Sequence, residues 1–325
     1  MWWSLEFDSE TCRSDVIMEK PLHTLPVIQP GVTTATSPAV FEKIAVVGLG
    51  LIGGSIALAS REVWPKCLVI GVDNKAVLEQ AMVRHAIDIA SDDLVVIAEA
   101  DVVVLACPVR QNILLLSEIG DYIKGSAIVT DVSSTKREIV ASAAQLPDRL
   151  TFVGGHPLGG APRGGFQHAR SDLFKDRPWL LTPIDETTGD AVLKLQDFVV
   201  GFGAVPHAMG PDDHDRVLSY LSHLPQITVS ALMHVVGTAI GEKGLRLTGR
   251  GLADTTRLAS SPGDIWRDIC ATNTAEVATA LDALIANLKT MRADLGKGDE
   301  IGRVFESAGQ WREVLLTEHQ AQKNK

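Results

Sequence analysis

A glycine-rich turn and one acid are the first residues of this 325-residue chain whose types and spacing could do chemistry. An apolar, β-branched run is followed by Gly48-x-Gly50-x-x-Gly53 and then by an alanine-rich segment. In such a motif the first glycine allows a tight turn, the second lets a pyrophosphate approach the backbone, and the third lets the helix pack closely on the strand. A second apolar run ends at Asp73, which lies 20 residues after Gly53, as a ribose-binding acid would.

Each of these features also has a plainer explanation. A glycine-rich turn can serve packing alone, and Asp73 could simply open the turn Asp73-Asn74-Lys75. The order strand, turn, helix, strand and acid is nevertheless what a dinucleotide site requires. Because a carboxylate repels a 2′-phosphate, we expect NAD, with NADP as a possible substitute. The residues predicted to contact this cofactor are Gly48, Gly50, Leu51, Ile52, Gly53, Asp73, Pro108 and Asp131.

His156 is the candidate general base. It lies directly after a short predicted strand, between a Gly-Gly pair and Pro157, in a loop with few side chains. A histidine held there could accept a proton near neutral pH, whereas a structural histidine hydrogen-bonded to a loop carbonyl is the alternative. In an open parallel sheet, ligands bind beyond the carboxyl ends of the strands. His156, Arg110 and the stretch 131–136 are all expected at that edge.

Ser134 is a second candidate catalytic residue. It follows a predicted strand and precedes a predicted helix, so its hydroxyl could face the nicotinamide end of the cofactor. The plainer alternative is that Ser133 or Ser134 caps the helix, with Glu138 completing a capping box.

The segments that position these residues alternate between strands and helices. Strands are predicted over 43–47, 67–72, 101–107, 126–131 and 152–155, further β-like pieces over 178–183 and 203–209, and helices over 76–86 and 111–123. This alternation predicts an α/β fold, in which residues 41–211 form a Rossmann-type domain with a doubly wound parallel sheet.

From residue 212 to 325 the apolar spacing is helical only, which predicts an all-α C-terminal domain. His214, surrounded by acids, is expected at a helix start, where carboxylates interact well with the helix dipole. Pro225 should kink its helix, and Gly241 to Gly251 should form a loop. A long apolar stripe along 277–295 could either face the core or form a dimer interface.

Composition narrows the class of protein. Hydrophobic residues make up 46% of the chain and charged residues 22%, as in ordinary globular proteins, and the formal charge of −10 disfavours nucleic-acid or anionic-membrane partners. Four cysteines without CxxC spacing, and histidines without partners at metal-ligand spacing, predict no metal site and a cytoplasmic location. No apolar run is long enough for a membrane span. Residues 1–40 are rich in Thr, Ser and Pro and are predicted to be a disordered extension.

Seven short motifs occur in one order between residues 42 and 295. They are Gly48-x-Gly50-x-x-Gly53-Gly54-Ser55, Thr130-Asp131-x-x-Ser134-x-Lys136, Gly154-Gly155-His156-Pro157, His214-Asp215, Ser222-His223-Leu224-Pro225, Asp254-x-x-Arg257 and Ile265-Trp266-Arg267-Asp268. Together they resemble the prephenate/arogenate (cyclohexadienyl) dehydrogenase family of tyrosine biosynthesis.

This resemblance implies oxidation of a cyclohexadienol at its C4 hydroxyl, with hydride passing to the nicotinamide and the ring carboxylate leaving as carbon dioxide. It also implies that His156 is the base and that Ser134 hydrogen-bonds the reacting hydroxyl. Arg257 would anchor a substrate carboxylate, which suits a planar and always charged guanidinium. Further substrate-pocket residues implied by the resemblance are Ser222, His223, Gln226 and Trp266. A surface ion pair for Arg257 and a core position for Trp266 are the alternatives, and the resemblance also implies a homodimer through the helical domain.

The chain departs from the family pattern at positions that bear on substrate choice. Gln226 stands where many relatives carry a histidine, and the stretch 159–162 lacks an acid that relatives often have there. A neutral amide cannot supply charge to attract the side-chain keto acid of prephenate. We therefore expect arogenate to be used at least as well as prephenate. No regulatory ACT domain fits in the remaining length, which puts feedback control by tyrosine in doubt.

Two other functions are weighed against this one. A β-hydroxyacid dehydrogenase would also place helices after a Rossmann domain, but it needs a lysine base on a helix of the second domain, where this chain has no suitable candidate. A non-catalytic NAD-binding sensor is the second alternative, and only an assay separates it from an enzyme.

Overall fold

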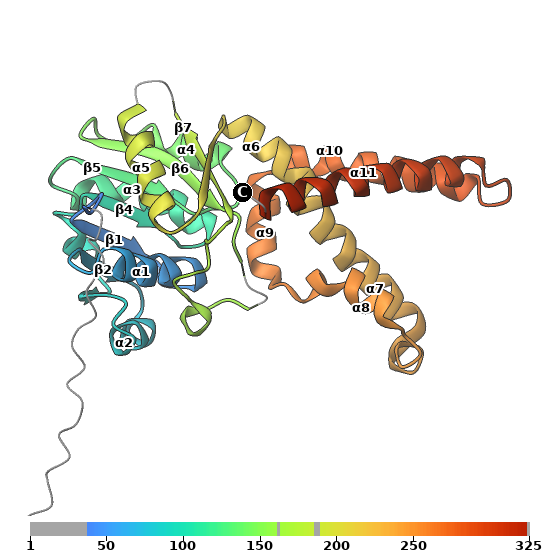
Figure 1. The fold of residues 1–325 in the computed structure, drawn as a ribbon, viewed down its shortest axis with the longest axis horizontal. Coiled ribbons are helices and arrows are strands. Elements are labelled where there is room, and N and C mark those ends of the chain that lie inside the picture. The colour runs from blue at the N-terminus through green and yellow to red at the C-terminus, as the bar shows by residue number, and fades with distance from the viewer. Residues whose placement is uncertain (1–37, 161–162, 185–188, 324–325) are drawn as a thin grey trace, which may run out of the picture. The chain divides into compact units, whose positions relative to one another are not determined.

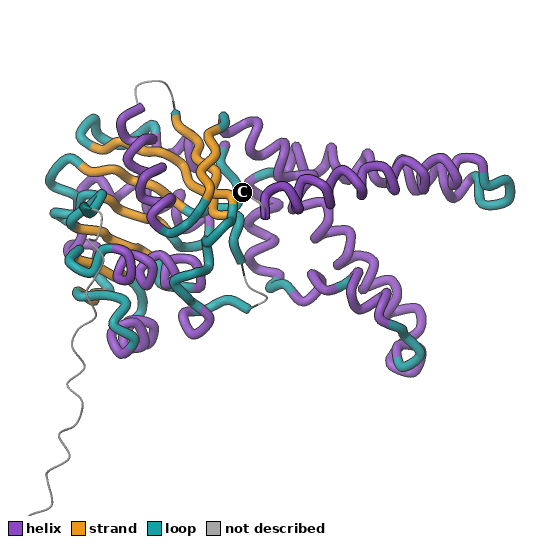
Figure 2. Tube along the Cα trace, in the orientation of Figure 1, coloured by secondary structure: helices purple, strands orange, loops and turns teal. Residues whose placement is uncertain are grey.

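The computed structural model describes residues 38–160, 163–184 and 189–323. The predicted extension, residues 1–40, therefore lies outside the described part except at its last residues. Within the described ranges, an eight-stranded sheet is followed in the chain by helices only, as Figures 1 and 2 show. This confirms the predicted fold class.

The sheet has the strand order β3-β2-β1-β4-β5-β6-β7-β8. Its strands are β1 (Lys43–Val47), β2 (Leu68–Val72), β3 (Ile89–Ser91), β4 (Val102–Leu105), β5 (Ala127–Asp131), β6 (Leu150–Pro157), β7 (Pro178–Pro183) and β8 (Val205–Ala208). β1 to β6 are parallel, whereas β7 is antiparallel to β6, and β8 is parallel to β7. The expectation of a wholly parallel sheet is therefore wrong at this edge. Between β6 and β7 the described residues form only the short helix η2 (Phe166–His168), and antiparallel neighbours need no crossover helix.

Helices cover both faces of the sheet, which explains why its strands are apolar on both sides. Ile44 and Val46 of β1 belong to the core on one face, and Ala45 and Val47 to the core on the other. The helices that contribute to the first core are α1 (Leu51–Val63), α2 (Lys75–Val83) and α5 (Gly189–Gly201), and those that contribute to the second are η1 (Leu94–Ile97), α3 (Val109–Tyr122) and α4 (Arg137–Ala143). This is the doubly wound arrangement that the alternation predicted.

The three glycines of the turn between β1 and α1 occupy different environments. Gly48 has φ +93°, a conformation that favours glycine. A Cβ atom on Gly53 would lie 1.9 Å from the carbonyl oxygen of Gly48, so only glycine lets α1 approach the turn this closely. A Cβ on Gly50 would meet no atom of the described residues within 4 Å. The first and third glycines thus build the turn, and the second leaves open space above it.

In the C-terminal part, from residue 211 to 323, the described residues form helices joined by short turns and no strands (Figure 2). Its helices are α6 (Pro211–Leu218), the π-helical turn η4 (Ser219–His223), α7 (Leu224–Leu245), α8 (Arg250–Thr255), η5 (Arg257–Ser260), α9 (Gly263–Thr272), α10 (Thr274–Ala293) and α11 (Asp299–Lys323). Pro225 lies in the first turn of α7, directly after η4, where a missing N–H is tolerated. The predicted loop at 241–251 is wrong in its first half, because α7 continues to Leu245 past a break at Gly241 (φ +60°).

Large apolar side chains are exposed along these helices. On α10 only Val277 and Ala280 are buried, while Ile285 and Leu288 face outward. Other exposed apolar residues of α7 and α11 are Leu232, Val235, Ile240, Phe305, Trp311, Val314, Leu315 and Leu316. Among the described residues, the continuous stretch 211–245 is long and apolar enough to cross a membrane by length and composition, and little of its most apolar part is buried. The apolar stripe that was predicted from spacing is therefore largely uncovered in a single chain.

The glycine turn provides a matched pair of substitutions. Gly53→Ala places a methyl group against backbone and should lower the free energy of unfolding by about 3 kcal/mol or more. Gly50→Ala adds a methyl group in open space and should change that free energy by less than about 0.5 kcal/mol. The same methyl would occupy the approach of a pyrophosphate, so it should weaken dinucleotide binding at least about tenfold.

Denaturant unfolding and dinucleotide titration measure both effects. Equal destabilisation by the two variants would contradict the assignment of separate roles to these glycines.

Candidate active site

Two cavities lie along the carboxyl ends of the parallel strands, and both contain predicted cofactor residues. The larger, of about 660 Å³, is lined by Gly48, Gly50, Asp73 and Pro108 among others. The smaller, of about 340 Å³, is lined by Gly50, Leu51, Ile52, Pro108 and Ser134, and on its far side by Ser261, Pro262, Ile265, Asp268 and Ile269 of the helical part. The two share Gly50 and Pro108, so a dinucleotide would extend from one into the other.

The beginning of α1 and the end of β2 fit such a ligand. Gly50 is the N-cap of α1 and has no side chain to cap it, and the first turn of the helix carries no acid. Free N–H groups and the positive end of the helix dipole are therefore available to phosphate. The Asp73 carboxylate accepts hydrogen bonds from the backbone N–H groups of Leu49 (2.6 Å) and Asn74 (2.7 Å). These bonds hold it at the wall of the larger cavity, and its contact with a ribose stays a prediction.

His156 lies within β6, paired with Leu180 of β7, and not in a loop beyond the strand as predicted. Its side chain is 8% exposed, and its Nδ1 lies 2.9 Å from Nε2 of His214 on α6. Burial, together with the neighbouring His214, Lys136 and His223, lowers the pKa of His156 well below its ordinary value. The imidazole is therefore neutral at neutral pH, which is the form a general base requires.

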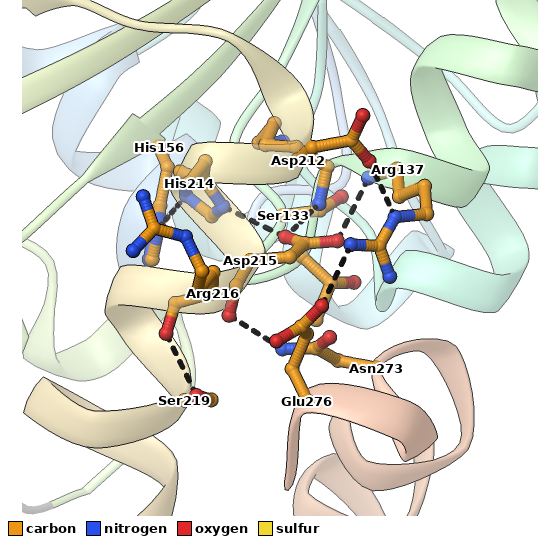
Figure 3. A network of polar contacts seen from close by, with 12 residues as sticks. Ser133, Arg137, His156, Asp212, His214, Asp215, Arg216, Ser219, Asn273 and Glu276 are labelled. Carbon is orange, nitrogen blue, oxygen red and sulfur yellow. Dashed lines mark hydrogen bonds and ion pairs between the residues drawn. The ribbon is translucent and has the colours of Figure 1, made fainter. Parts of the chain in front are cut away.

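His214 and Asp215 join this buried cluster, which the argument from motif spacing did not predict. His214 Nδ1 is 2.8 Å from Asp215 Oδ1, and both side chains are fully buried (Figure 3). The same carboxylate accepts the backbone N–H groups of Lys136 (2.7 Å) and Arg137 (2.9 Å), which begin α4. Residues on α6 thus cap a helix of the sheet domain. The signal that could have found them is the His-Asp pair itself, one of the seven motifs.

The capping box considered as the alternative for Ser133 or Ser134 is not formed. The Ser133 hydroxyl accepts a hydrogen bond from the Asn112 amide (3.0 Å), and Lys136, the N-cap of α4, makes no side-chain cap within the described residues. Because Asp215 supplies the cap from another element, Ser134 is not needed for it. Ser134 instead lines the smaller cavity, where its hydroxyl is available to a ligand.

Asp131 and Lys136 form a fully buried ion pair with an O–N distance of 2.5 Å. Asp131 also accepts the backbone N–H groups of Ser133 (2.8 Å) and Gly155 (3.0 Å). All these donors come from the protein and Asp131 is 0% exposed, so its carboxylate does not reach the cavities, contrary to the cofactor contact predicted for it. It holds together the loop that carries Ser134 and the strand that carries His156. Burial lowers the pKa of Lys136, and Asp131 opposes that shift.

The residues implied for the substrate differ in burial: one group is buried or half-buried, and Arg257 is exposed. His223 is fully buried, packs edge-on against the half-buried Trp266 with ring centroids 6.0 Å apart, and has its pKa lowered by burial to about 4. Ser222 is half-buried beside it. Arg257 is exposed at the start of η5 and makes no ion pair with any described residue, so the surface ion pair considered for it is not formed.

Gln226 faces the protein and not an open site. Its amide Nε2 donates to the carbonyl of Leu258 (2.7 Å) and to Ser230 (3.2 Å), and its Oε1 accepts from Ser261 (3.1 Å). It is 5% exposed. These bonds fasten η5, which begins with Arg257, to α7, and they occupy both ends of the amide for which a substrate contact was implied.

Ion pairs and hydrogen bonds hold α6, the start of α4 and the later helices together around this site. Arg137 pairs with Asp212 (2.6 Å) and Glu276 (3.1 Å), and the Asn273 amide donates to the backbone carbonyl of Asp215 (2.9 Å), as Figure 3 shows. The hydroxyls of Thr135 and Thr272 are 2.8 Å apart. The position of His214 beside His156 is thus fixed from several directions.

Comparisons with known proteins agree with these features. Family models for prephenate dehydrogenase match the nucleotide-binding domain at residues 56–207 and the dimerization domain at residues 210–306. The prephenate dehydrogenase of Bacillus subtilis is 35% identical over 284 residues, which cover 84% of this chain and 76% of that one. The cyclohexadienyl dehydrogenase of Zymomonas mobilis is 31% identical over 289 residues, covering 86% and 98%.

A solved structure shares the fold as well. The prephenate dehydrogenase from A. aeolicus, in complex with hydroxyphenyl propionate and NAD+, is similar with a TM-score of 0.78 and 26% identity, over 84% of this chain and 98% of that one. Two family models that together cover most of the chain, and relatives above 30% identity along most of their length, lead to one conclusion: this chain belongs to the prephenate dehydrogenase family.

Proposed function

We propose that this chain catalyses the oxidative decarboxylation of prephenate, arogenate or both, with NAD as the hydride acceptor. The observation that carries the proposal is a neutral, buried His156 near the carboxyl end of β6. β6 pairs with β5, the strand that the Ser134 loop follows, at the edge of the sheet where the nucleotide cavities lie. The chemistry needs a base for the C4 hydroxyl, a hydrogen-bonding group beside it and a cation for the carboxylates. His156, Ser134 and Arg257 have these properties.

In the proposed mechanism, some residues of the chain hold the cofactor and others act on the substrate. NAD supplies the hydride acceptor when it is bound. Gly50 and the N-terminus of α1, which line the cavities, would hold its pyrophosphate, and Asp73 would hold a ribose. Ser134 would orient the reacting hydroxyl towards His156. His156 accepts the hydroxyl proton while the ring loses hydride and carbon dioxide, and aromatisation drives the reaction.

The substrate that we propose is arogenate at least as much as prephenate. The two differ at the side-chain carbon that carries either an amino group or a keto group. Gln226 is neutral and its amide is bonded internally to Leu258, Ser230 and Ser261, so it supplies no charge that would select the keto acid. Arg257, exposed at the start of η5, is a cation close to this position in the chain and suits the carboxylates that both substrates share.

The proposed domains are a Rossmann domain at 41–211 and a helical domain at 212–325, and the helical domain is the part that we expect to join two copies of the chain. We propose that a second copy of the chain covers the exposed apolar side chains of α7, α10 and α11. The match of residues 210–306 to a dimerization domain supports this. Charged residues along α11 disfavour lipid as the covering medium, so we propose a soluble, cytoplasmic homodimer.

A steady-state assay with prephenate and arogenate, each with NAD and with NADP, tests the function. We expect turnover with NAD, weaker turnover with NADP because of Asp73, and kcat/KM for arogenate at least equal to that for prephenate. Formation of the reduced nicotinamide at its absorbance band measures all four combinations. A large excess for prephenate would contradict the proposed substrate preference, and no turnover with bound NAD would favour a sensor.

Replacement of the base tests the catalytic role of His156. His156→Asn should lower kcat roughly 10²–10⁴-fold and leave NAD affinity near that of the wild type. Since the pKa of His156 is depressed from 6.5, the wild-type base stays unprotonated as the pH falls. Its kcat/KM should therefore stay level from pH 8 through 6.5 and decline only at lower pH. An acid limb centred at or above 6.5 would contradict this assignment.

Arg257 and Gln226 should affect substrate binding in distinguishable ways. Arg257→Ala removes the proposed anchor and should raise KM about 10- to 100-fold, the equivalent of about 1.4–2.7 kcal/mol, with little change in kcat. Gln226→Leu leaves the partners on η5 without hydrogen bonds and should lower the free energy of unfolding by about 1–3 kcal/mol while raising KM less. Ser230→Ala, which loses only the 3.2 Å contact, serves as the control and should change neither. Unchanged stability of Gln226→Leu would argue against a positioning role for this residue.

A further inference from the structure

Three buried side chains form one continuous hydrogen-bonded chain behind the base. His156 Nδ1 lies 2.9 Å from His214 Nε2, and His214 Nδ1 lies 2.8 Å from Asp215 Oδ1. His156 is 8% exposed, and the other two are not exposed at all. Figure 3 shows the chain running from the strand to α6. The mechanism above uses only its first member.

Asp215, the last member of this hydrogen-bonded series, determines which ring nitrogens carry protons. Burial acts to raise the pKa of Asp215, but the bonds from His214 and from the backbone N–H groups of Arg137 and Lys136 outweigh it and lower that pKa. Asp215 is therefore a carboxylate, which can only accept hydrogen bonds. The proton between Asp215 and His214 must sit on Nδ1 of His214.

The same reasoning gives the position of the proton on His156. Burial lowers the pKa of His214, so its ring is neutral and its Nε2 carries a lone pair. Nδ1 of His156 must then donate to that lone pair, because one proton is needed between two ring nitrogens 2.9 Å apart. A neutral imidazole with its proton on Nδ1 has its free lone pair on Nε2. Within the described residues Nε2 of His156 has no hydrogen-bond partner, so that lone pair is available to a substrate hydroxyl.

Among the charged groups around His156, the Asp215 carboxylate is the anion connected to it through hydrogen bonds. Lys136 is paired with Asp131, and His223 is neutral with a pKa of about 4. When His156 accepts a proton, its new positive charge meets an acceptor at His214 whose other nitrogen is bonded to the Asp215 carboxylate. Charge-assisted hydrogen bonds of this kind are about twice as strong as neutral ones.

We propose that His214, oriented by Asp215, is a positioning residue that holds His156 in the tautomer with its lone pair on Nε2 and stabilises the imidazolium formed during the reaction. The inference rests on the proposed function for its kinetic consequence. The tautomer itself is a property of the resting protein and can be measured without turnover.

The tautomer is read from ring 15N chemical shifts of histidine-labelled protein saturated with NAD, with the His156 signals identified by their loss in His156→Asn. We expect the shift of a protonated nitrogen at Nδ1 and of an unprotonated nitrogen at Nε2. A predominant Nε2–H form would overturn the proposal. This measurement decides the question even if neither substrate is turned over, an outcome that would contradict only the proposed function.

Kinetics of His214 variants test the second half of the proposal. His214→Phe keeps the bulk and removes the acceptor, and should lower kcat on the order of 10²–10⁴-fold while KM and NAD affinity stay near wild type. His214→Gln can still accept from His156 and donate to Asp215, and should recover most of the lost activity. His207→Gln, at an exposed histidine of β8, is the matched control and should have wild-type kcat.

The outcomes separate a positioning role from a merely structural one. Equal loss in the Phe and Gln variants, or wild-type kcat in the Phe variant, would overturn the proposal. Asp215→Asn is not used, because this carboxylate also caps α4 and its loss would disturb the Ser134 loop. If His214→Phe fails to bind NAD, the comparison of His214→Gln with wild type and the 15N measurement carry the test, and a 15N result with the proton on Nε2 contradicts the proposal.

Discussion

One carboxylate holds the active site together. Asp215 lies on the first helix after the sheet, and its two oxygens accept the N–H groups that begin α4 and the proton of His214. It therefore fixes the loop that carries Ser134 and the histidine that contacts the base. Because the group is buried, leaving any of these donors without a partner would cost the full desolvation penalty of that donor. A second buried carboxylate, Asp131, fixes the same loop from the side of the sheet.

Features that depend on a short stretch of chain could be predicted from the sequence. The three glycines of the turn meet their constraints within six residues of one another, and the alternation of apolar runs reports burial on both faces of the sheet. Even here the direction of β7 was not predictable. The direction of a strand depends on the connection that precedes it. The segment between β6 and β7 contains no crossover helix among its described residues, and β7 is antiparallel to β6.

Features that depend on partners far along the chain could not be predicted from spacing. His156 and His214 are 58 residues apart, and the cap of α4 comes from 78 residues away. In both places a local explanation was at hand, since acids around His214 suit a helix start and serines before α4 suit an N-cap. Gln226 shows the limit of resemblance. Its position implied contact with substrate, whereas its amide hydrogen-bonds Leu258 and Ser261.

The division of the site between two parts of the chain has a consequence for recombination. The glycine turn, Asp73, Ser134 and the proposed base His156 all come before residue 211, whereas His214 and Asp215, which we propose set the tautomer of His156, come after it. Exchange of helical domains among related enzymes would therefore exchange the His-Asp pair along with Arg257, the proposed substrate anchor. A chimera whose incoming helix lacked the His-Asp pair would keep its nucleotide site and lose the fixed orientation of its base.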